Sequence, residues 1–512
     1  MATSSTDPSR RQKASAHPPG ADPRRWKALL VLSALQFMIL LDMTIVNVAL
    51  PAIEDGMAFD PAGLTWVVNG YALAAGSLLI LGGRLADYYG RRRLLIIGVV
   101  LFAASSALCG FATHPAMMIL GRFGQGAAEA IAAPASLGLI ALLFTDAKER
   151  SKALGIWGGL VALGGTLGYV FSGLLTSFTS WRWIFLINLP VALIALIAIP
   201  ALLDESRMAP GRRGRLDVWG AATSTAGLVA IVYGLLEAAE NPWGSAAVVF
   251  PVAAGIALLL GMLIIERRVP DPLLPRGFFD NRTRSVVNFT SLFFMAAFIG
   301  YTFMLTLFEQ DVLGYTPLQS GLGYLPLGFG IGVGIGISSV LVPKIGVKPV
   351  VVAGFLGAGV GLALTSFATT DSSYLLGILP GMIVFAVFAG ATMPAATNAA
   401  LHNVTTQDSG LASGVQSTAQ QIGGALGLAV LVTFAMRRFL ADVTAGEPVE
   451  VAMTNGFTLG FQIGAVLMFV GGVLLAVFLE RVDGALRDPV VEGVEADLAA
   501  LSASDDEVGH RP

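Results

Sequence analysis

The chain has 512 residues, of which 55% are hydrophobic and only 13% are charged, and its formal net charge at pH 7 is −3. Soluble globular domains carry about 25% charged residues, so this composition excludes a soluble fold of the same size. The negative net charge argues against a nucleic-acid partner, and a single cysteine, Cys109, excludes an internal disulfide framework and a thiolate metal cluster. The composition predicts an all-α polytopic protein of the lipid bilayer without a metal site.

A helix that crosses a hydrocarbon core of roughly 30 Å needs about 20 apolar residues. Fourteen segments of the chain meet this condition, in an order of six, two and six. The first six are Trp26–Leu50, Leu64–Gly83, Leu94–Phe111, Ala116–Leu143, Ala153–Phe178 and Trp183–Leu203. The next two are Val218–Leu236 and Ala246–Ile265. The last six are Val286–Phe308, Gln319–Val342, Pro349–Phe367, Tyr374–Asn398, Gly410–Ala435 and Phe457–Leu479.

The positions of the basic residues test this count, because Lys and Arg collect in cytoplasmic loops. With a cytoplasmic N-terminus, all but four of the 31 Lys and Arg residues fall in cytoplasmic segments. The exceptions are Arg122, within a span, and Arg182, Arg437 and Arg438, in outside loops. Removing one span would invert every later loop, so we expect fourteen spans with both termini in the cytoplasm.

The expected organisation has five parts. Residues 1–25 are rich in Ser, Pro and Arg and predict a disordered cytoplasmic N-terminus, followed by an anchor rather than a cleaved signal peptide. We expect an N-terminal six-helix bundle at 26–203, a linker with two extra transmembrane helices at 204–285 and a C-terminal six-helix bundle at 286–480. The acidic residues 481–512 predict a disordered cytoplasmic tail.

Asp42, Arg122 and Glu129 are the ionisable residues well inside the predicted spans. Each costs at least about 2.5–3.5 kcal/mol on insertion scales. Arg122, Gln125 and Glu129 follow helical spacing and share one face of the fourth span. Lipid would not accept this polar face, so we expect it to line the bundle interior or a water-filled cavity.

Two interpretations of these residues stay open. Desolvation and a neighbouring guanidinium act in opposite directions on the proton affinity of a carboxyl. A movement that separates Asp42 from Arg122, or that hydrates Glu129, would therefore load or release a proton. The alternative is a static Asp–Arg pair and a permanently protonated, hydrogen-bonded Glu129.

The connection after the second span, residues 83–93, reads GRLADYYGRRR. An aspartate at a helix end that faces arginines can form a charge-assisted clamp between helices, and glycine permits close contacts and tight turns. A plain topology signal would explain the arginines but not the aspartate and the glycines. We expect a conformational clamp made by Gly83, Asp87, Gly90, Arg91 and Arg92.

This connection resembles the G-x-L-a-D-x-x-G-r-r signature of the major facilitator superfamily. Residues 41–51, 122–126 and 181–190 resemble the first-helix motif, the fourth-helix R-x-x-Q-G motif and the fifth-to-sixth-helix connection of its fourteen-span drug:proton antiporter family. The resemblance covers residues 25–480. It implies two six-helix bundles, two linking helices and export by alternating access, with the proton gradient rather than a cofactor as the source of energy.

The fifth span copies the antiporter glycine pattern incompletely. Tyr169 stands where that family has proline, and Ser172 replaces a glycine. Small residues allow close helix packing, whereas the missing proline removes a bend. The glycines that fit the spacing are Gly155, Gly164, Gly168 and Gly173.

The resemblance implies that the first, fourth, seventh and tenth core helices line the substrate cavity. Met and aromatic side chains suit flat, apolar and variable ligands. Ordinary core or lipid-facing packing is the alternative for each of them. The expected lining residues are Phe294, Phe298, Tyr301, Met304 and Gln420.

The function expected from these features is proton-coupled export of amphipathic drugs or antibiotics by a monomer in a bacterial cell membrane. Two embedded carboxyls and one arginine favour a cationic or neutral substrate over an anion. A proton-coupled importer on the same fold and a non-transporting membrane sensor are the alternatives. An enzyme is not expected, because the sequence holds no nucleotide loop, metal cluster or nucleophile–base pair in a polar pocket.

Overall fold

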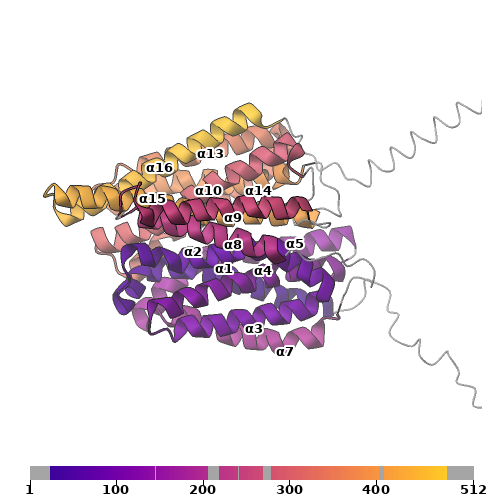
Figure 1. Ribbon diagram of the computed structural model, residues 1–512. Coiled ribbons are helices and arrows are strands. Elements are labelled where there is room, and N and C mark those ends of the chain that lie inside the picture. The colour runs from indigo at the N-terminus through magenta and orange to yellow at the C-terminus, as the bar shows by residue number, and fades with distance from the viewer. Residues whose placement is uncertain are drawn as a thin grey trace, which may run out of the picture.

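The computed structural model describes residues 24–144, 146–205, 218–239, 241–268, 278–402 and 409–480. Within these ranges the chain forms helices, turns and bends, and no strand. The predicted tail at 481–512 and nearly all of the predicted N-terminal segment lie outside the described residues. In Figure 1 the long helices run side by side, with the first half of the chain in indigo to purple on one side and the last half in orange to yellow on the other.

The helices of the first half are α1 (Arg24–Met57), α2 (Pro61–Tyr89), α3 (Arg91–Gly110), α4 (Pro115–Leu143), α5 (Ala147–Phe178), α6 (Trp183–Leu186) and α7 (Asn188–Leu202). They are followed by α8 (Val218–Glu237) and α9 (Ala246–Arg268). The last half holds the 3-10 turn η2 (Phe278–Asp280), α10 (Arg282–Leu307), the π-helical turn η3 (Phe308–Val312), α11 (Pro317–Gly323), α12 (Leu325–Ile345), α13 (Val347–Thr365), the π-helical turn η4 (Tyr374–Ile378), α14 (Leu379–Ala400), α15 (Ser409–Thr444) and α16 (Val449–Phe478).

Local sequence explains where several helices begin. Asp60 accepts a hydrogen bond from the Gly63 N–H and precedes a proline at the start of α2. Thr316 and Gln319 form a reciprocal capping box at the start of α11. Side-chain oxygens at these positions satisfy N–H groups that the first helical turn leaves without partners.

Twelve helical segments of the described chain are long and apolar enough to cross a membrane. They coincide with twelve of the predicted spans. The two remaining predicted spans correspond to α4 and α5, helices of 29 and 32 residues that are not among those twelve. The fold is therefore all-helical with twelve apolar candidate spans, and fourteen crossings stay a prediction.

The contacts define two ends of the bundle. At the end where α1 starts and α16 stops, which we call the terminal end, Arg25 pairs with Glu149 at 2.8 Å. Lys348 donates there to the Leu479 carbonyl at 2.6 Å. At the opposite end, Arg182 donates to the Ala112 carbonyl at 2.8 Å. Figure 1 shows the helices running between these two ends.

The helices pack mainly within their own half. In the first half α4 packs on α2 and α3, and α5 packs on α1; in the last half α10 packs on α15 and α16, and α14 packs on α12 and α13. The halves meet where α2 contacts α15 and where α5 contacts α11 and α12. α8 and α9 pack on each other, and α8 also touches α2 and α15. The seam between the halves is thus where a site can be shared by both.

Candidate functional site

Asp42 of α1 lies at the centre of a buried polar network. Its Oδ2 accepts a hydrogen bond from Arg122 Nη1 at 2.7 Å. Its Oδ1 accepts from Gln125 Nε2 at 2.8 Å and from Asn188 Nδ2 at 2.6 Å. All four side chains are at most 1% exposed. A buried charge is tolerated when it is paired and hydrogen-bonded in this way.

The donors of this network are held in turn by other groups. Ser106 of α3 accepts from Gln125 Nε2 at 3.2 Å and from Asn188 Nδ2 at 3.0 Å. Its hydroxyl donates to the Phe185 carbonyl at 2.8 Å. Arg122 Nε donates to the Val67 carbonyl of α2 at 2.7 Å. The network therefore ties together α1, α2, α3, α4 and the α6–α7 segment.

Glu129, on the same helix as Arg122, does not share this network. It is 8% exposed, and its Oε2 has no hydrogen-bond partner among the described residues. The Tyr71 hydroxyl is the polar group that faces the Glu129 carboxyl, while the Tyr71 ring lies 4.5 Å from the Arg122 guanidinium carbon. The structure thus brings Asp42, Arg122 and Gln125 into direct contact and leaves Glu129 outside them.

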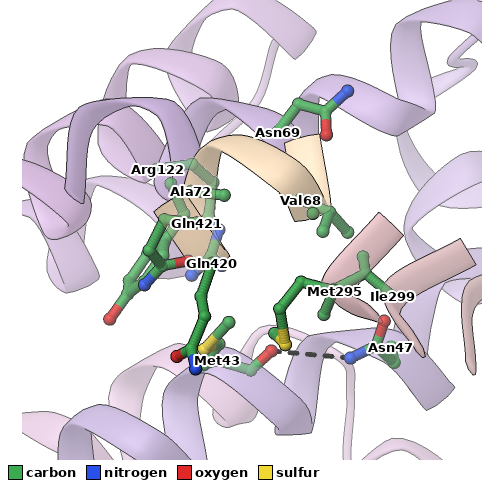
Figure 2. A pocket seen from close by; sticks show the side chains of 12 residues that line it. Met43, Asn47, Val68, Asn69, Ala72, Arg122, Met295, Ile299, Gln420 and Gln421 are labelled. Atoms are coloured by element: carbon green, nitrogen blue, oxygen red, sulfur yellow. Dashed lines mark hydrogen bonds between the residues drawn. The ribbon is translucent and has the colours of Figure 1, made fainter. Parts of the chain in front are cut away.

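A pocket lies between the two halves, next to this network (Figure 2). Its walls come from α1, α2, α4, α10 and α15, so both halves contribute. In Figure 2, Gln420 and Gln421 stand on one side of the pocket, and Met295 and Ile299 on another. The lining residues are Met43, Asn47, Val68, Asn69, Tyr71, Ala72, Arg122, Met295, Ile299, Gln420, Gln421 and Gly424.

Two asparagines of the pocket have unused hydrogen-bonding capacity. Asn69 is 0% exposed, and neither of its amide atoms has a partner among the described residues. The Oδ1 of Asn47, which is 4% exposed, is also without a partner. Buried polar groups are normally satisfied, so the Asn47 oxygen is available to a polar group of a ligand, whereas the Asn69 amide is turned away from the middle of the pocket (Figure 2).

Of the predicted lining residues, Gln420 of α15 lines the pocket. The predicted lining residues of α10 instead pack against other helices of the last half. Tyr301 packs on Phe385 with 4.8 Å between ring centres, and Phe294 packs on Phe355 at 5.7 Å. Phe298 also packs on Phe385, at 5.7 Å, and Met304 is buried against Gly460. The reason is rotational: α10 turns Met295 and Ile299 towards the pocket and its aromatic residues towards α13, α14 and α16.

The residues of the predicted clamp make interhelical contacts at the terminal end. Arg91 Nη1 donates to the Gly138 carbonyl of α4 at 2.7 Å, and Arg92 Nη1 donates to the Leu203 carbonyl after α7 at 3.0 Å. Gly90 ends α2 with a φ of 106°, a conformation that L side chains rarely adopt. Gly83 lies beside Pro134 of α4. The Asp87 side chain is outside the described residues.

The fifth-helix glycines separate into two groups. A Cβ on Gly164 would lie 3.0 Å from the Phe37 carbonyl of α1, and one on Gly168 would lie 3.0 Å from the Leu41 carbonyl. A Cβ on Gly173 would lie 2.6 Å from the carbonyl of Pro317 in α11, whereas one on Gly155 would meet no atom of the described residues within 4 Å outside its own helical turn. Gly164 and Gly168 thus let α5 pack closely against the part of α1 that leads to Asp42.

Tyr169, which replaces the family's proline, has a contact of its own. Its ring stacks on Tyr324 with 4.2 Å between centres and 9° between planes. Because α5 belongs to the first half and Tyr324 joins α11 to α12, this stack connects the two halves.

Sequence reasoning did not single out three buried polar residues. Asn188 stands in the segment 181–190 that carries the resemblance, but no local pattern marks it as part of the site. Ser106 gives no signal, because serine is common inside membrane helices. The sequence predicts a span that ends at Phe308, just before Glu309, whereas the helical segment continues to Val312 as a π-helical turn. It is 0% exposed.

Residues 32–428 match the sequence family described as the Major Facilitator Superfamily. The chain belongs to this superfamily. It is 38% identical to the puromycin resistance protein pur8 of Streptomyces alboniger over 462 residues, which cover 88% of this chain and 90% of that protein. It is also 38% identical to the lincomycin resistance protein of Streptomyces lincolnensis, over 80% of this chain and 84% of that protein. The superfamily and its bacterial relatives identify a multi-pass transporter of the bacterial inner membrane.

Solved structures agree on the fold. The D-xylose–proton symporter superposes with a TM-score of 0.63 at 16% identity, covering 90% of this chain and 99% of the symporter. The peptide transporter POT in complex with sulfate superposes with a TM-score of 0.64 at 15% identity, covering 88% of this chain and 94% of that chain. At these identities the likeness concerns the fold alone.

Proposed function

We propose that this transporter is a proton-coupled antiporter that exports amphipathic antibiotics or drugs by alternating access. The similarity over most of the chain to proteins named for resistance to puromycin and to lincomycin supports export. The observation that carries the proposal is the Asp42–Arg122 pair beside a pocket shared by both halves. Protons, a small amphipathic substrate and the lipid bilayer are its partners, and the monomer is the working unit.

The proposed topology has fourteen crossings. Both termini and the terminal end face the cytoplasm, and the opposite end faces outward. In this arrangement residues 26–203 and 286–480 are the two six-helix bundles, and 204–285 carry the two linking helices. Arg91 and Arg92 then lie on the cytoplasmic side, as the positive-inside rule requires.

The proton and the substrate compete through Arg122, which belongs to both the network and the pocket lining. When Asp42 is ionised, the pair is neutral and leaves the pocket open to a cationic or neutral ligand. When Asp42 takes up a proton, Arg122 loses its counter-ion and its positive charge turns towards the pocket. Charge repulsion and occupied volume then disfavour the ligand, which is the exclusion that antiport requires. An anionic ligand would instead be favoured by protonation.

Glu129 and Gln125 complete the proposed site in different ways. Gln125 bridges the pair, since it donates to Asp42 and its Oε1 accepts from Arg122 at 2.9 Å. Glu129 lies outside the pair and can add negative charge when a cation approaches, so we assign it to substrate choice. The aromatic residues of α10 support the pocket wall from behind.

We propose that the clamp controls the rate of the conformational cycle. Arg91 and Arg92 hold the α2–α3 connection to carbonyls at the ends of α4 and α7. By resemblance to the family signature, Asp87 is the acidic partner in this clamp. The glycine contacts of α5 with α1 give a close-packed surface next to Asp42 along which α5 can shift.

Transport in proteoliposomes tests the proposal. Purified protein is reconstituted with a pH-sensitive dye inside, and puromycin, lincomycin and ethidium are added in turn. Antiport predicts that substrate moving in one direction drives protons in the other, and that this exchange is lost in Asp42→Asn. Proton movement in the same direction as the substrate would indicate a symporter, and no substrate-dependent movement with any compound would contradict proton coupling.

A further inference from the structure

Glu309 is a second fully buried carboxyl, which the network around Asp42 does not include. It lies in η3, the π-helical turn that continues α10. Neither of its carboxyl oxygens has a hydrogen-bond partner among the described residues. π-helical turns are rare and are frequently found at functional sites, so this position is a candidate for a role beyond packing.

The groups that face Glu309 carry no charge at neutral pH. Ser320 of α11 is the polar side chain that acts on its carboxyl, and a Cβ on Gly323 would lie 3.4 Å from its Oε1. From α16, Phe457 packs beside η3. The titratable groups around Glu309 are Tyr301, Tyr324 and Tyr374.

No ion pair of the described residues involves Glu309. Three acidic residues of the opposite end act on one another instead: Glu54 is partly exposed, and Asp55 and Asp311 are exposed. A fully buried carboxylate without a counter-ion is strongly unfavourable, and the single neighbouring hydroxyl of Ser320 offsets only part of that cost, so such a group becomes neutral instead. Glu309 is therefore protonated in the conformation seen here.

α11 links Glu309 to the contact between the two halves. Ser320 and Gly323 lie on the side of α11 that faces Glu309. Leu318 and Gly321 lie on the side that faces α5. The Leu318 N–H donates to Ser177 Oγ at 3.1 Å, and a Cβ on Gly321 would be 2.6 Å from the Tyr169 carbonyl.

Two residues near Glu309 also contact the first half at the opposite end of the bundle. Gln310, the next residue, donates from Nε2 to the Val48 carbonyl of α1 at 2.9 Å. Tyr324, which follows α11, stacks on Tyr169 and donates to the Thr302 carbonyl at 2.7 Å. Ionisation of Glu309 would require water to reach its carboxyl group. The helix that lies between Glu309 and α5 is α11.

We propose that Glu309 binds a proton that holds the opposite end of the transporter closed. When this proton is lost, the carboxylate is hydrated and α11 separates from α5. The proton exchanges with the aqueous phase at the opposite end, and Glu309 thus acts as a gating site distinct from the Asp42–Arg122 pair. The inference rests on the proposed function only in treating this closure as a gate of a transporter; the proton site does not depend on what is carried.

Distance measurements between spin labels test the proposal without substrate. The labels replace Thr179 and Ala445, which are exposed residues at the opposite end of the first and the last half. The background carries Cys109→Ala, because Cys109 is the only cysteine of the chain. The wild-type background is expected to give a single short distance at pH 5 and a growing longer-distance population towards pH 10. Glu309→Gln, which mimics the neutral acid, is expected to keep the short distance throughout.

Asp42→Asn is the matched control, because it removes a carboxyl that is equally buried, at 0% exposure, and leaves η3 and α11 unchanged. It is expected to retain the pH-dependent change in distance. The proposal is overturned if Glu309→Gln responds to pH like the wild type, or if the wild type keeps one distance from pH 5 to pH 10. Size-exclusion profiles and helical circular dichroism establish that each variant is folded. A protein that shows the pH response but exports none of the compounds would contradict only the proposed function.

Discussion

The Asp42 carboxylate and the Asn188 amide lie 146 positions apart in the chain and meet at 2.6 Å in the buried network. This contact joins the middle of α1 to the first residue of α7. It gives the carboxylate a neutral donor in addition to the charged one from Arg122. Asn188 therefore positions the acid that we propose as the coupling group.

Replacing Asn188 tests this positioning role. Asn188→Ala removes one donor from Asp42 Oδ1 and one from Ser106 Oγ, and both oxygens keep only the donor of Gln125. A hydrogen bond to a charged group contributes about 1.5–3 kcal/mol. We expect a lower unfolding temperature in detergent and a shifted pH profile of export. Asn188→Gln is the conservative control, because it keeps the amide. If both variants unfold at the wild-type temperature and keep the wild-type pH profile, the role is refuted.

Asp42→Asn is expected to abolish proton-coupled export while the protein still inserts into the membrane. It also leaves Arg122 buried without a counter-ion, and breaking a buried pair in this way typically costs about 3–5 kcal/mol. The double variant Asp42→Asn/Arg122→Gln is therefore expected to be more stable than the single one, yet equally inactive. Thermal unfolding and dye export measured on all three proteins check this; dye export retained by the single variant would count against the relay.

Glu129→Gln is expected to impair cationic substrates selectively. The substitution removes a negative charge outside the Asp42–Arg122 pair and keeps the shape of the side chain. Export of ethidium should fall severalfold, whereas export of an uncharged substrate should change little. Comparing the two rates in the same vesicles checks the prediction, and an equal loss for both substrates argues for a purely structural role.

Tyr169→Ala is expected to weaken the closure at the opposite end. It removes the stack on Tyr324, and aromatic pairs contribute about 0.5–1.5 kcal/mol beyond their buried area. The measurable result is a larger longer-distance population for spin labels at Thr179 and Ala445 at pH 5. Tyr169→Phe keeps the ring and should behave as the wild type. Identical distances in the two variants would show that the stack does not hold the halves together.

The clamp predicts slower cycling when an arginine loses its carbonyl partner. Arg92→Ala removes the bond to the Leu203 carbonyl, and Asp87→Asn removes the acidic charge that the family signature provides. Both variants are expected to export several times more slowly at normal expression. Turnover measured per reconstituted protein separates this effect from poor insertion, and wild-type turnover in both variants would rule the clamp out.

Long apolar runs made the helices predictable, because only a helix satisfies its backbone internally in lipid. The pairing of Asp42 with Arg122 could be expected in outline, since both are charges that lipid excludes. The orientation of α10 could not, because its central residues 292–300 are apolar all round and periodicity does not distinguish the face towards Met295 from the face towards Tyr301. Asn188 was missed because its partner is set by the packing of α7 against α1 rather than by any local pattern.

The exchange of protons for substrate in reconstituted vesicles is the decisive test of proton coupling through Asp42. Vesicles that enclose a pH-sensitive dye receive puromycin on one side, and the initial rate of internal pH change is recorded for the wild type and for Asp42→Asn. We expect that substrate entry drives protons in the opposite direction in the wild type and that the variant shows no such movement. Substrate transport by the wild type without proton movement, or proton exchange retained in Asp42→Asn, would contradict it.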